Sequence, residues 1–125
     1  MPYTTTWLED GLIWNYFGIL TGYELLQSNL EIFGDERFDD IRYQIVDLTA
    51  VEKVQVENQH MKKIAFLDMV AARTNPRVRV AVVTTFEDGV GLNDTYNDYT
   101  AEKSPWVTKT FTTREAAEAW AKAKD

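Results

Sequence analysis

Short runs of β-branched residues alternate along this chain with stretches whose apolar residues recur at helical spacing. Two β-type runs, residues 4–8 and 12–17, come first and are joined through an Asp-Gly pair, which tolerates the positive φ of a tight turn. Helical and β-type segments then alternate along the rest of the chain. The resulting order, β-β-α-β-α-β-α-β-α, predicts an α/β fold with an open, mostly parallel sheet, an N-terminal antiparallel hairpin and about four helices.

Caps and breakers mark the ends of the expected helices. Thr21 begins a capping-box pattern, and a glycine closes the helix that follows it. Asn58 is the expected cap of a long helix that runs to about Arg73, where an Asn-Pro pair stops it. Two further helices are expected, over residues 93–103 and after a second capping-box pattern at residues 112–115.

The run Tyr-Gln-Ile-Val-Asp-Leu at residues 43–48 is too apolar to face water. We therefore expect an interior strand that is covered on both faces. A second such strand is predicted over residues 77–85, and a short last one over residues 107–111. Residues 49–56 show no clean period, so the pattern leaves their structure open.

The length and charge of the chain limit its partners. The 125 residues fit one domain, residues 1–125. The 13 basic and 20 acidic side chains leave a net charge of −7, which argues against a nucleic-acid partner and would repel an anionic membrane surface. The apolar runs are far shorter than the ~20 residues that span a bilayer, so no membrane insertion is expected.

The chain contains no cysteine. This excludes disulfides, thiolate nucleophiles and cysteine metal sites, and it is compatible with a reducing compartment. The first residues lack the basic-then-apolar order of a signal peptide. We therefore expect a cytoplasmic protein, and we expect neither a cofactor nor a metal.

Four segments, residues 18–22, 43–49, 75–83 and 111–117, carry a resemblance to a known family. In this order they resemble small bacterial proteins called SpoIIAA-like, which are related in fold to STAS domains, the anti-sigma-factor antagonists. The resemblance covers nearly the whole chain, but its motifs are mostly strand ends and helix caps. It implies a regulatory module that binds protein, and such relatives are sometimes coupled with CRAL-TRIO-type lipid-binding domains.

The resemblance also implies a phosphorylated serine at the start of the helix after the interior strand, where added charge breaks docking to a kinase partner. The matching residues 55–60 contain no Ser or Thr. A switch of the standard kind therefore cannot operate there. Thr49 is the nearest hydroxyl, and Glu57 could mimic a permanently charged state.

A candidate site lies where the two interior strands end. Their carboxyl ends are expected to share one rim, where open α/β sheets place their sites. The candidate residues at this rim are Asp47, Thr49, Thr84, Thr85 and Phe86. The alternative for Asp47 is a carboxylate that accepts hydrogen bonds from loop amides, and for Thr49 it is a turn hydroxyl.

Asp68 falls at helical spacing among apolar residues, where another apolar residue is expected. It could pair with Arg42, with Arg73 or with a tyrosine hydroxyl, and a small shift of helix phase would place it at the surface. Asp47 and Asp68 together would make an acid/base pair, although nothing in the sequence brings them within reach.

His60 is the single histidine of the chain. Glu57 lies three residues before it, a spacing compatible with metal ligands but common at helix starts, so solvated helix-start residues are the plainer interpretation. Together with Asn58 they mark a surface that a protein partner could contact.

The glycines at residues 89 and 91 lack the other residues of a phosphate-binding loop, and they indicate a turn.

Two functions are consistent with these patterns. The first is a non-enzymatic, STAS-like regulatory or protein-interaction module that docks through residues 47–60 and forms a homodimer. The second is a carrier of a small apolar ligand or lipid, whose pocket would lie between the sheet and the helix of Leu92, Tyr96 and Tyr99. The aromatic content of 13% motivates the carrier, because tryptophan and tyrosine line many pockets. A two-carboxylate enzyme is a third, weaker hypothesis.

Overall fold

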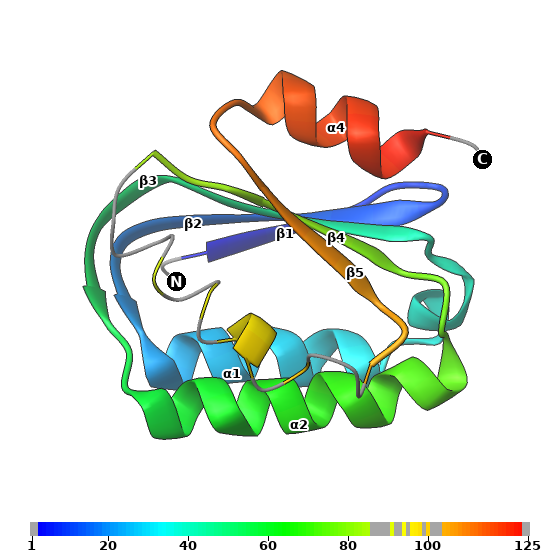
Figure 1. Ribbon diagram of the computed structural model, residues 1–125, viewed down its shortest axis with the longest axis horizontal. Helices are drawn as coiled ribbons and strands as arrows, with labels where there is room; N and C mark the ends of the chain where they lie inside the picture. The colour runs from blue at the N-terminus through cyan, green and yellow to red at the C-terminus, as the bar shows by residue number, and fades with distance from the viewer. Residues whose placement is uncertain are drawn as a thin grey trace.

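The computed structural model describes residues 3–85, 91, 94, 96–98, 100 and 104–123. Its elements, labelled as in Figure 1, are β1 (Tyr3–Trp7), β2 (Gly11–Thr21), α1 (Gly22–Phe33), the short helix η1 (Glu36–Asp40), β3 (Tyr43–Gln55), α2 (Asn58–Thr74), β4 (Arg79–Val83), β5 (Val107–Phe111) and α4 (Arg114–Lys122). The described residues at positions 91, 94, 96–98 and 100 are helical.

The strands form one five-stranded sheet in the order β1-β2-β3-β4-β5. β1 and β2 make the antiparallel hairpin, with Trp7 opposite Leu12, and each later strand pairs parallel with the one before it. The predicted α/β fold, with its mostly parallel sheet and N-terminal hairpin, is confirmed.

Helices cover both faces of this sheet: α1 and α2 lie against one face and α4 lies against the other (Figure 1). Side chains alternate across β3. Ile45 therefore packs in the small apolar cluster with Ala117 of α4, whereas Leu48 belongs to the larger cluster on the α1/α2 side. Ile45 is fully buried between β2 and β4, as expected of an interior strand.

Two helix caps differ from the predictions, and β3 continues through residues that the sequence left open. The cap of α2 is Glu57 and not Asn58, which is the first helical residue. The cap of α4 is Thr113 and not Thr112, and its hydroxyl accepts from the amide of Ala116. Residues 49–55, whose structure the sequence left open, continue β3 as a strand.

The ends of β2 and β3 form a two-stranded ribbon that bends toward the helix layer at the left of Figure 1. β1 pairs with β2 only as far as Tyr16, and β4 pairs with β3 only as far as Asp47. Beyond these points β2 and β3 continue together to the pair Thr21–Gln55, with two shifts of register. Gly18 lies in this stretch with φ of 69°, which favours glycine.

Candidate functional site

Asp47 lies at the predicted rim, opposite Val83 of β4. Its Oδ1 accepts hydrogen bonds from the Thr49 amide at 2.9 Å and from the Thr49 hydroxyl at 2.6 Å. Its Oδ2 accepts from Arg114 of α4 at 2.9 Å, and the same Arg114 nitrogen donates to Asn15 of β2 at 3.2 Å. Arg114 therefore connects the start of α4 to two strands, through Asp47 of β3 and Asn15 of β2.

These contacts also determine the charge of Asp47. Burial acts to raise the pKa of this carboxyl, but the hydrogen bonds from Thr49 and then the interaction with Arg114 outweigh burial. The pKa of Asp47 is lowered, and the side chain is an ionised anchor whose two oxygens are both engaged.

The other predicted rim residues differ in their burial. Thr84 is buried, and its amide donates to the carbonyl of Phe111 on β5. Thr85 is exposed. Phe86 lies outside the described residues, as do Leu92 and Tyr99 of the helix to which the alternative pocket was assigned.

Glu57 and His60 act as helix caps. The His60 Nδ1 accepts from the Glu57 amide at 3.1 Å, and Gln59 donates to the Glu57 carboxylate at 2.7 Å. Asn58 is exposed, and the imidazole of His60 packs against Gly22 at the start of α1. Among the described residues, no group of three or more His, Asp or Glu side chains is placed to hold a metal ion.

Asp68 is buried on α2, with 5% of the residue exposed. Its partner is the hydroxyl of Tyr96, which donates to Oδ2 at 2.6 Å, so a tyrosine and neither arginine takes this position. Burial raises the pKa of Asp68 to about 7, and the Tyr96 hydrogen bond counteracts only part of the increase. Burial, and next the charge of Asp68, raise the pKa of Tyr96.

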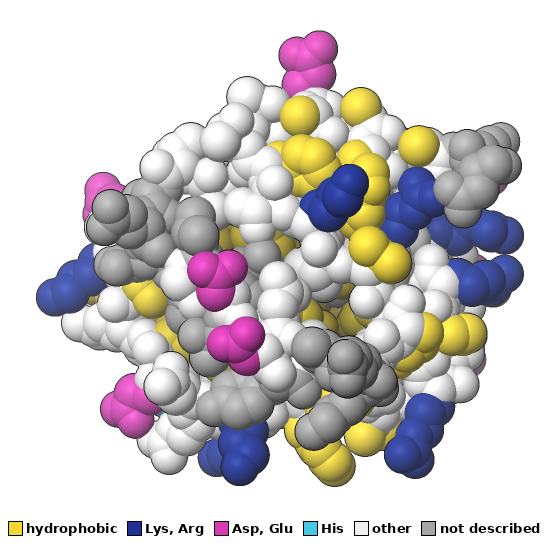
Figure 2. Space-filling view, viewed as in Figure 1, with side chains coloured by type: hydrophobic (Ala, Val, Ile, Leu, Met, Phe, Trp, Pro, Cys, Tyr) yellow, Lys and Arg dark blue, Asp and Glu magenta, His cyan; other side chains and the backbone are white. Residues whose placement is uncertain are grey.

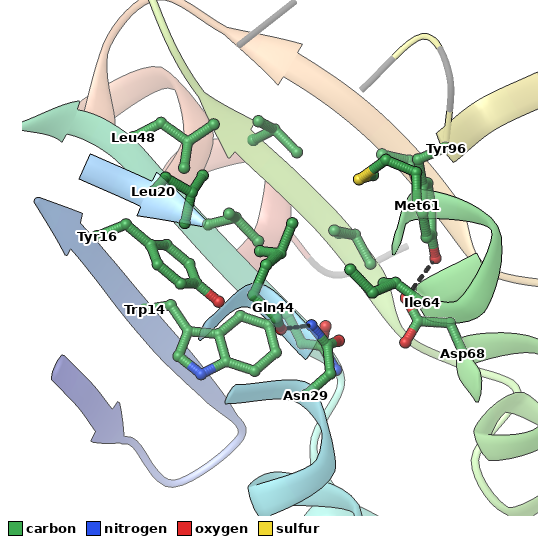
Figure 3. A pocket seen from close by; sticks show the side chains of 15 residues that line it. Trp14, Tyr16, Leu20, Asn29, Gln44, Leu48, Met61, Ile64, Asp68 and Tyr96 are labelled. Carbon is green, nitrogen blue, oxygen red and sulfur yellow. Dashed lines mark hydrogen bonds between the residues drawn. The ribbon is translucent and has the colours of Figure 1, made fainter. Parts of the chain in front are cut away.

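A cavity of about 80 Å³ lies between the sheet and the helices α1 and α2 (Figure 3). The described residues that line it are Trp14, Tyr16, Leu20, Leu25, Asn29, Gln44, Val46, Leu48, Met61, Ile64, Asp68, Val80, Val82, Tyr96 and Thr108. In Figure 3 Trp14 and Tyr16 lie on one side, Asp68 and Tyr96 lie on the other, and Asn29 and Gln44 are drawn between them. Most of this lining is apolar.

Three buried polar atoms in the cavity wall have no hydrogen-bond partner. They are the indole nitrogen of Trp14, Nε2 of Gln44 and Oδ1 of Asp68. Buried polar groups are usually paired, so such atoms point to a site. In the sequence, Asp68 is recognisable because it interrupts the apolar stripe of a helix. No comparable signal indicates Gln44 or Trp14, because each occupies an ordinary position in a strand.

Asp47 and Asp68 lie on opposite sides of the sheet. Asp47 contacts Arg114 on the α4 side, whereas Asp68 lines the cavity on the α1/α2 side together with Gln44 and Val46 of β3. This arrangement gives the two carboxylates no shared cleft, so the geometry does not support the acid/base pair.

Basic side chains gather at the opposite end of the strands. In Figure 2 several Lys and Arg side chains lie at the right edge, where the parallel strands begin in the matching view of Figure 1. Arg42, Arg77, Arg79 and Lys122 line a cleft there together with Glu9 and Asp10, so its lining carries charges of both signs. Arg79 donates to the carbonyls of Trp120 and Ala123 at the end of α4, which gives it a structural role.

The fold and this arrangement define a small α/β module whose sheet carries helices on both faces. Solved structures with the same fold include an uncharacterised DUF3478-family protein with a SpoIIAA-like fold from Shewanella loihica PV-4, at 18% identity and TM-score 0.55 over 95% of this chain and 91% of that one. They also include the anti-sigma factor antagonist SpoIIAA in its unphosphorylated form, at 10% identity and TM-score 0.65 over 98% and 99%.

The chain therefore has a SpoIIAA-like, STAS-type fold, as the sequence resemblance implied. No family model matches the sequence, and no curated protein is significantly similar to it. No helix among the described residues is long and apolar enough to cross a membrane.

Proposed function

We propose that this chain is a non-enzymatic, STAS-like regulatory module that acts by binding protein, with a second copy of the chain as its partner. The binding surface is the ribbon of β2 and β3 beyond Tyr16 and Asp47. Its β3 part, residues 48–55, belongs to the segment 47–60 through which docking is expected from the sequence.

The observation that carries this proposal is the exposure of two large apolar side chains on the ribbon. Phe17 is 41% exposed and Ile19 is 49% exposed. No third described strand pairs with the ribbon, so within the described part of the chain the outer edges of its two strands have no ladder partner. Exposed apolar side chains beside a strand edge that no described strand covers are typical of an interface, and a second copy offers the same surface in a symmetric contact.

We further propose that docking is not controlled by phosphorylation. Residues 55–60 contain no hydroxyl side chain, and the Thr49 hydroxyl donates to Asp47 at 2.6 Å. A phosphate on Thr49 would break this bond and place about −1.5 to −2 charge beside a carboxylate. Mass spectrometry of the protein from its native cell should find Thr49 unmodified, and phosphate at that residue would restore the switch hypothesis.

Sedimentation velocity tests the docking surface. The wild-type chain should sediment as a dimer, and the double variant Phe17→Asp/Ile19→Asp should sediment as a monomer with an unchanged circular dichroism spectrum. Leu30→Asp is the matched control, because Leu30 is 46% exposed but lies on α1, and this variant should remain dimeric. A monomeric wild-type chain at its highest soluble concentration would rule out self-association.

Small-ligand binding is a second candidate function, and the cavity beside Asp68 favours it. Its volume of about 80 Å³ is well below the ~300–1,000 Å³ of drug-sized ligand sites. This volume favours a compact ligand over a lipid of the CRAL-TRIO type.

A further inference from the structure

We propose that the cavity beside Asp68 is a binding site for a compact organic amine that also carries a hydrogen-bond acceptor, such as a short amino alcohol. This inference narrows the second candidate function above, and it does not depend on the ribbon of β2 and β3. Asp68 would bind the ammonium group and Gln44 would bind the acceptor.

The unpartnered atoms define the polar ends of the ligand. Asp68 Oδ1 is an acceptor without a donor, and Gln44 Nε2 is a donor without an acceptor. Asp68 is 5% exposed and Gln44 is 1% exposed, and both line the same cavity. A ligand with one donor and one acceptor would satisfy both groups, which otherwise carry the cost of burial without a hydrogen bond.

The charge of the site favours an amine over a neutral donor. Among the described lining residues the titratable groups are Asp68, Tyr16 and Tyr96, and no Lys, Arg or His is present. Nothing in this wall therefore compensates an ionised Asp68. A buried carboxylate gains most from a bound cation.

The volume and the apolar lining restrict the size of the ligand. A cavity of about 150 Å³ holds benzene, so one of about 80 Å³ has room for roughly three or four non-hydrogen atoms. The atoms between the two polar ends would contact Leu20, Leu25 and Ile64, so they should be aliphatic.

Three probes with the same number of non-hydrogen atoms test each part of this proposal by NMR titration. Ethanolamine has both polar groups, propylamine lacks the acceptor, and 1-propanol lacks the amine. The signals to follow are the Gln44 side-chain amide and the indole N–H of Trp14. We expect ethanolamine to bind at least tenfold more tightly than 1-propanol, with propylamine between them.

Two variants separate the ligand contacts from the fold. Asp68→Asn keeps the shape but removes the charge, so ethanolamine should lose its advantage over 1-propanol. Gln44→Met removes the donor, so ethanolamine should bind no more tightly than propylamine. Glu36→Gln is the control, because Glu36 is exposed on η1, off the ribbon and outside the cavity lining, and it should leave all three affinities unchanged.

The outcomes that would overturn the proposal are specific. Equal affinities for the three probes would show that they only fill an apolar space. If the NMR signals of Gln44 and Trp14 do not move on addition of any probe, the cavity is closed to all three. An unchanged preference in Asp68→Asn would exclude Asp68 as the amine site. Because these titrations do not measure dimer formation, their failure is distinguishable from failure of the docking proposal.

Discussion

The imidazole of His60 occupies the space that a side chain at Gly22 would fill. A Cβ at Gly22 would overlap Nδ1 and Cγ of His60. Gly22 is the first residue of α1, and His60 lies in the first turn of α2. The N-terminal ends of the two helices are therefore in contact, with the His60 imidazole packed directly against the backbone of Gly22.

Gly22→Ala should therefore destabilise the protein, although alanine is the better helix former by about 1 kcal/mol. The added methyl must displace the imidazole and break its bond to the Glu57 amide. We expect a net loss of about 1–2 kcal/mol in the free energy of unfolding, measured by urea denaturation. Gly34→Ala is the control, because a methyl group there would meet no atom within 4 Å, and it should be neutral or stabilising.

The same loss should disappear in a His60→Ala background, since the clash would then be absent. A Gly22→Ala variant that is equally destabilised with and without His60 would show that another contact at the start of α1 is responsible.

Arg114→Gln should weaken the connection between the sheet and α4. The Asp47 carboxylate would keep its Thr49 hydrogen bonds but lose its cationic partner. Because about a third of the Arg114 side chain is exposed, solvent screens the pair, and we expect a loss of only about 1 kcal/mol at pH 7. Lys122→Gln, which removes an exposed pair with Glu118, should cost less than ~0.5 kcal/mol.

The pH dependence of this loss has a definite sign. The pKa of Asp47 is lowered in the folded protein, so its contribution is present above the pKa of the unfolded chain and is lost as the pH falls. The difference between wild type and Arg114→Gln should therefore shrink below about pH 4. A difference that stays constant down to pH 2 would assign the loss to packing and not to charge.

Much of the fold follows from local pattern, and the reason is visible at β3. The apolar run 43–48 is covered on both faces, so its burial and the meeting of Asp47 with Val83 at one rim could be predicted. Beyond Leu48 the strand leaves the covered part of the sheet, and its exposed residues include Glu52 and Lys53. Buried and exposed residues do not alternate there, so the hydrophobic pattern of the sequence could not show that the strand continues.

The candidate site was harder to predict, because its contacts join distant segments. The helical stripe of α2 correctly indicated that the position of Asp68 faces inward. Its partner Tyr96 lies 28 residues later in another helix, and no periodicity specifies such a pair. Alternation puts Asp47 and Gln44 on opposite faces of β3, but only the structure shows which helices cover each face.

Asp68 should make the protein less stable as the pH rises. Its pKa is about 7 in the folded protein and about 3.9 when unfolded, so between these values the folded state retains a proton that the unfolded state releases. Stability should fall across this range by up to about 4 kcal/mol. Asp68→Asn removes the titration, so relative to wild type it should gain stability between pH 4 and pH 7.

Urea denaturation at each pH unit from 4 to 8 measures this effect, with Glu36→Gln on η1 as the exposed carboxylate control. The control should follow the wild-type curve. Parallel curves for wild type and Asp68→Asn would mean that Asp68 is ionised in the folded protein throughout this range.

Tyr96→Phe should raise the pKa of Asp68 above its wild-type value of about 7, because the Tyr96 hydroxyl donates to the carboxylate and favours the ionised form. Carboxyl-carbon NMR measures this pKa directly. The variant leaves a second oxygen of Asp68 without a partner, so it should also lose about 1–3 kcal/mol in the free energy of unfolding. Tyr23→Phe, at a tyrosine that is 72% exposed, should change neither quantity. A pKa of Asp68 that stays constant or falls in Tyr96→Phe would mean that the hydroxyl does not stabilise the ionised carboxylate in solution.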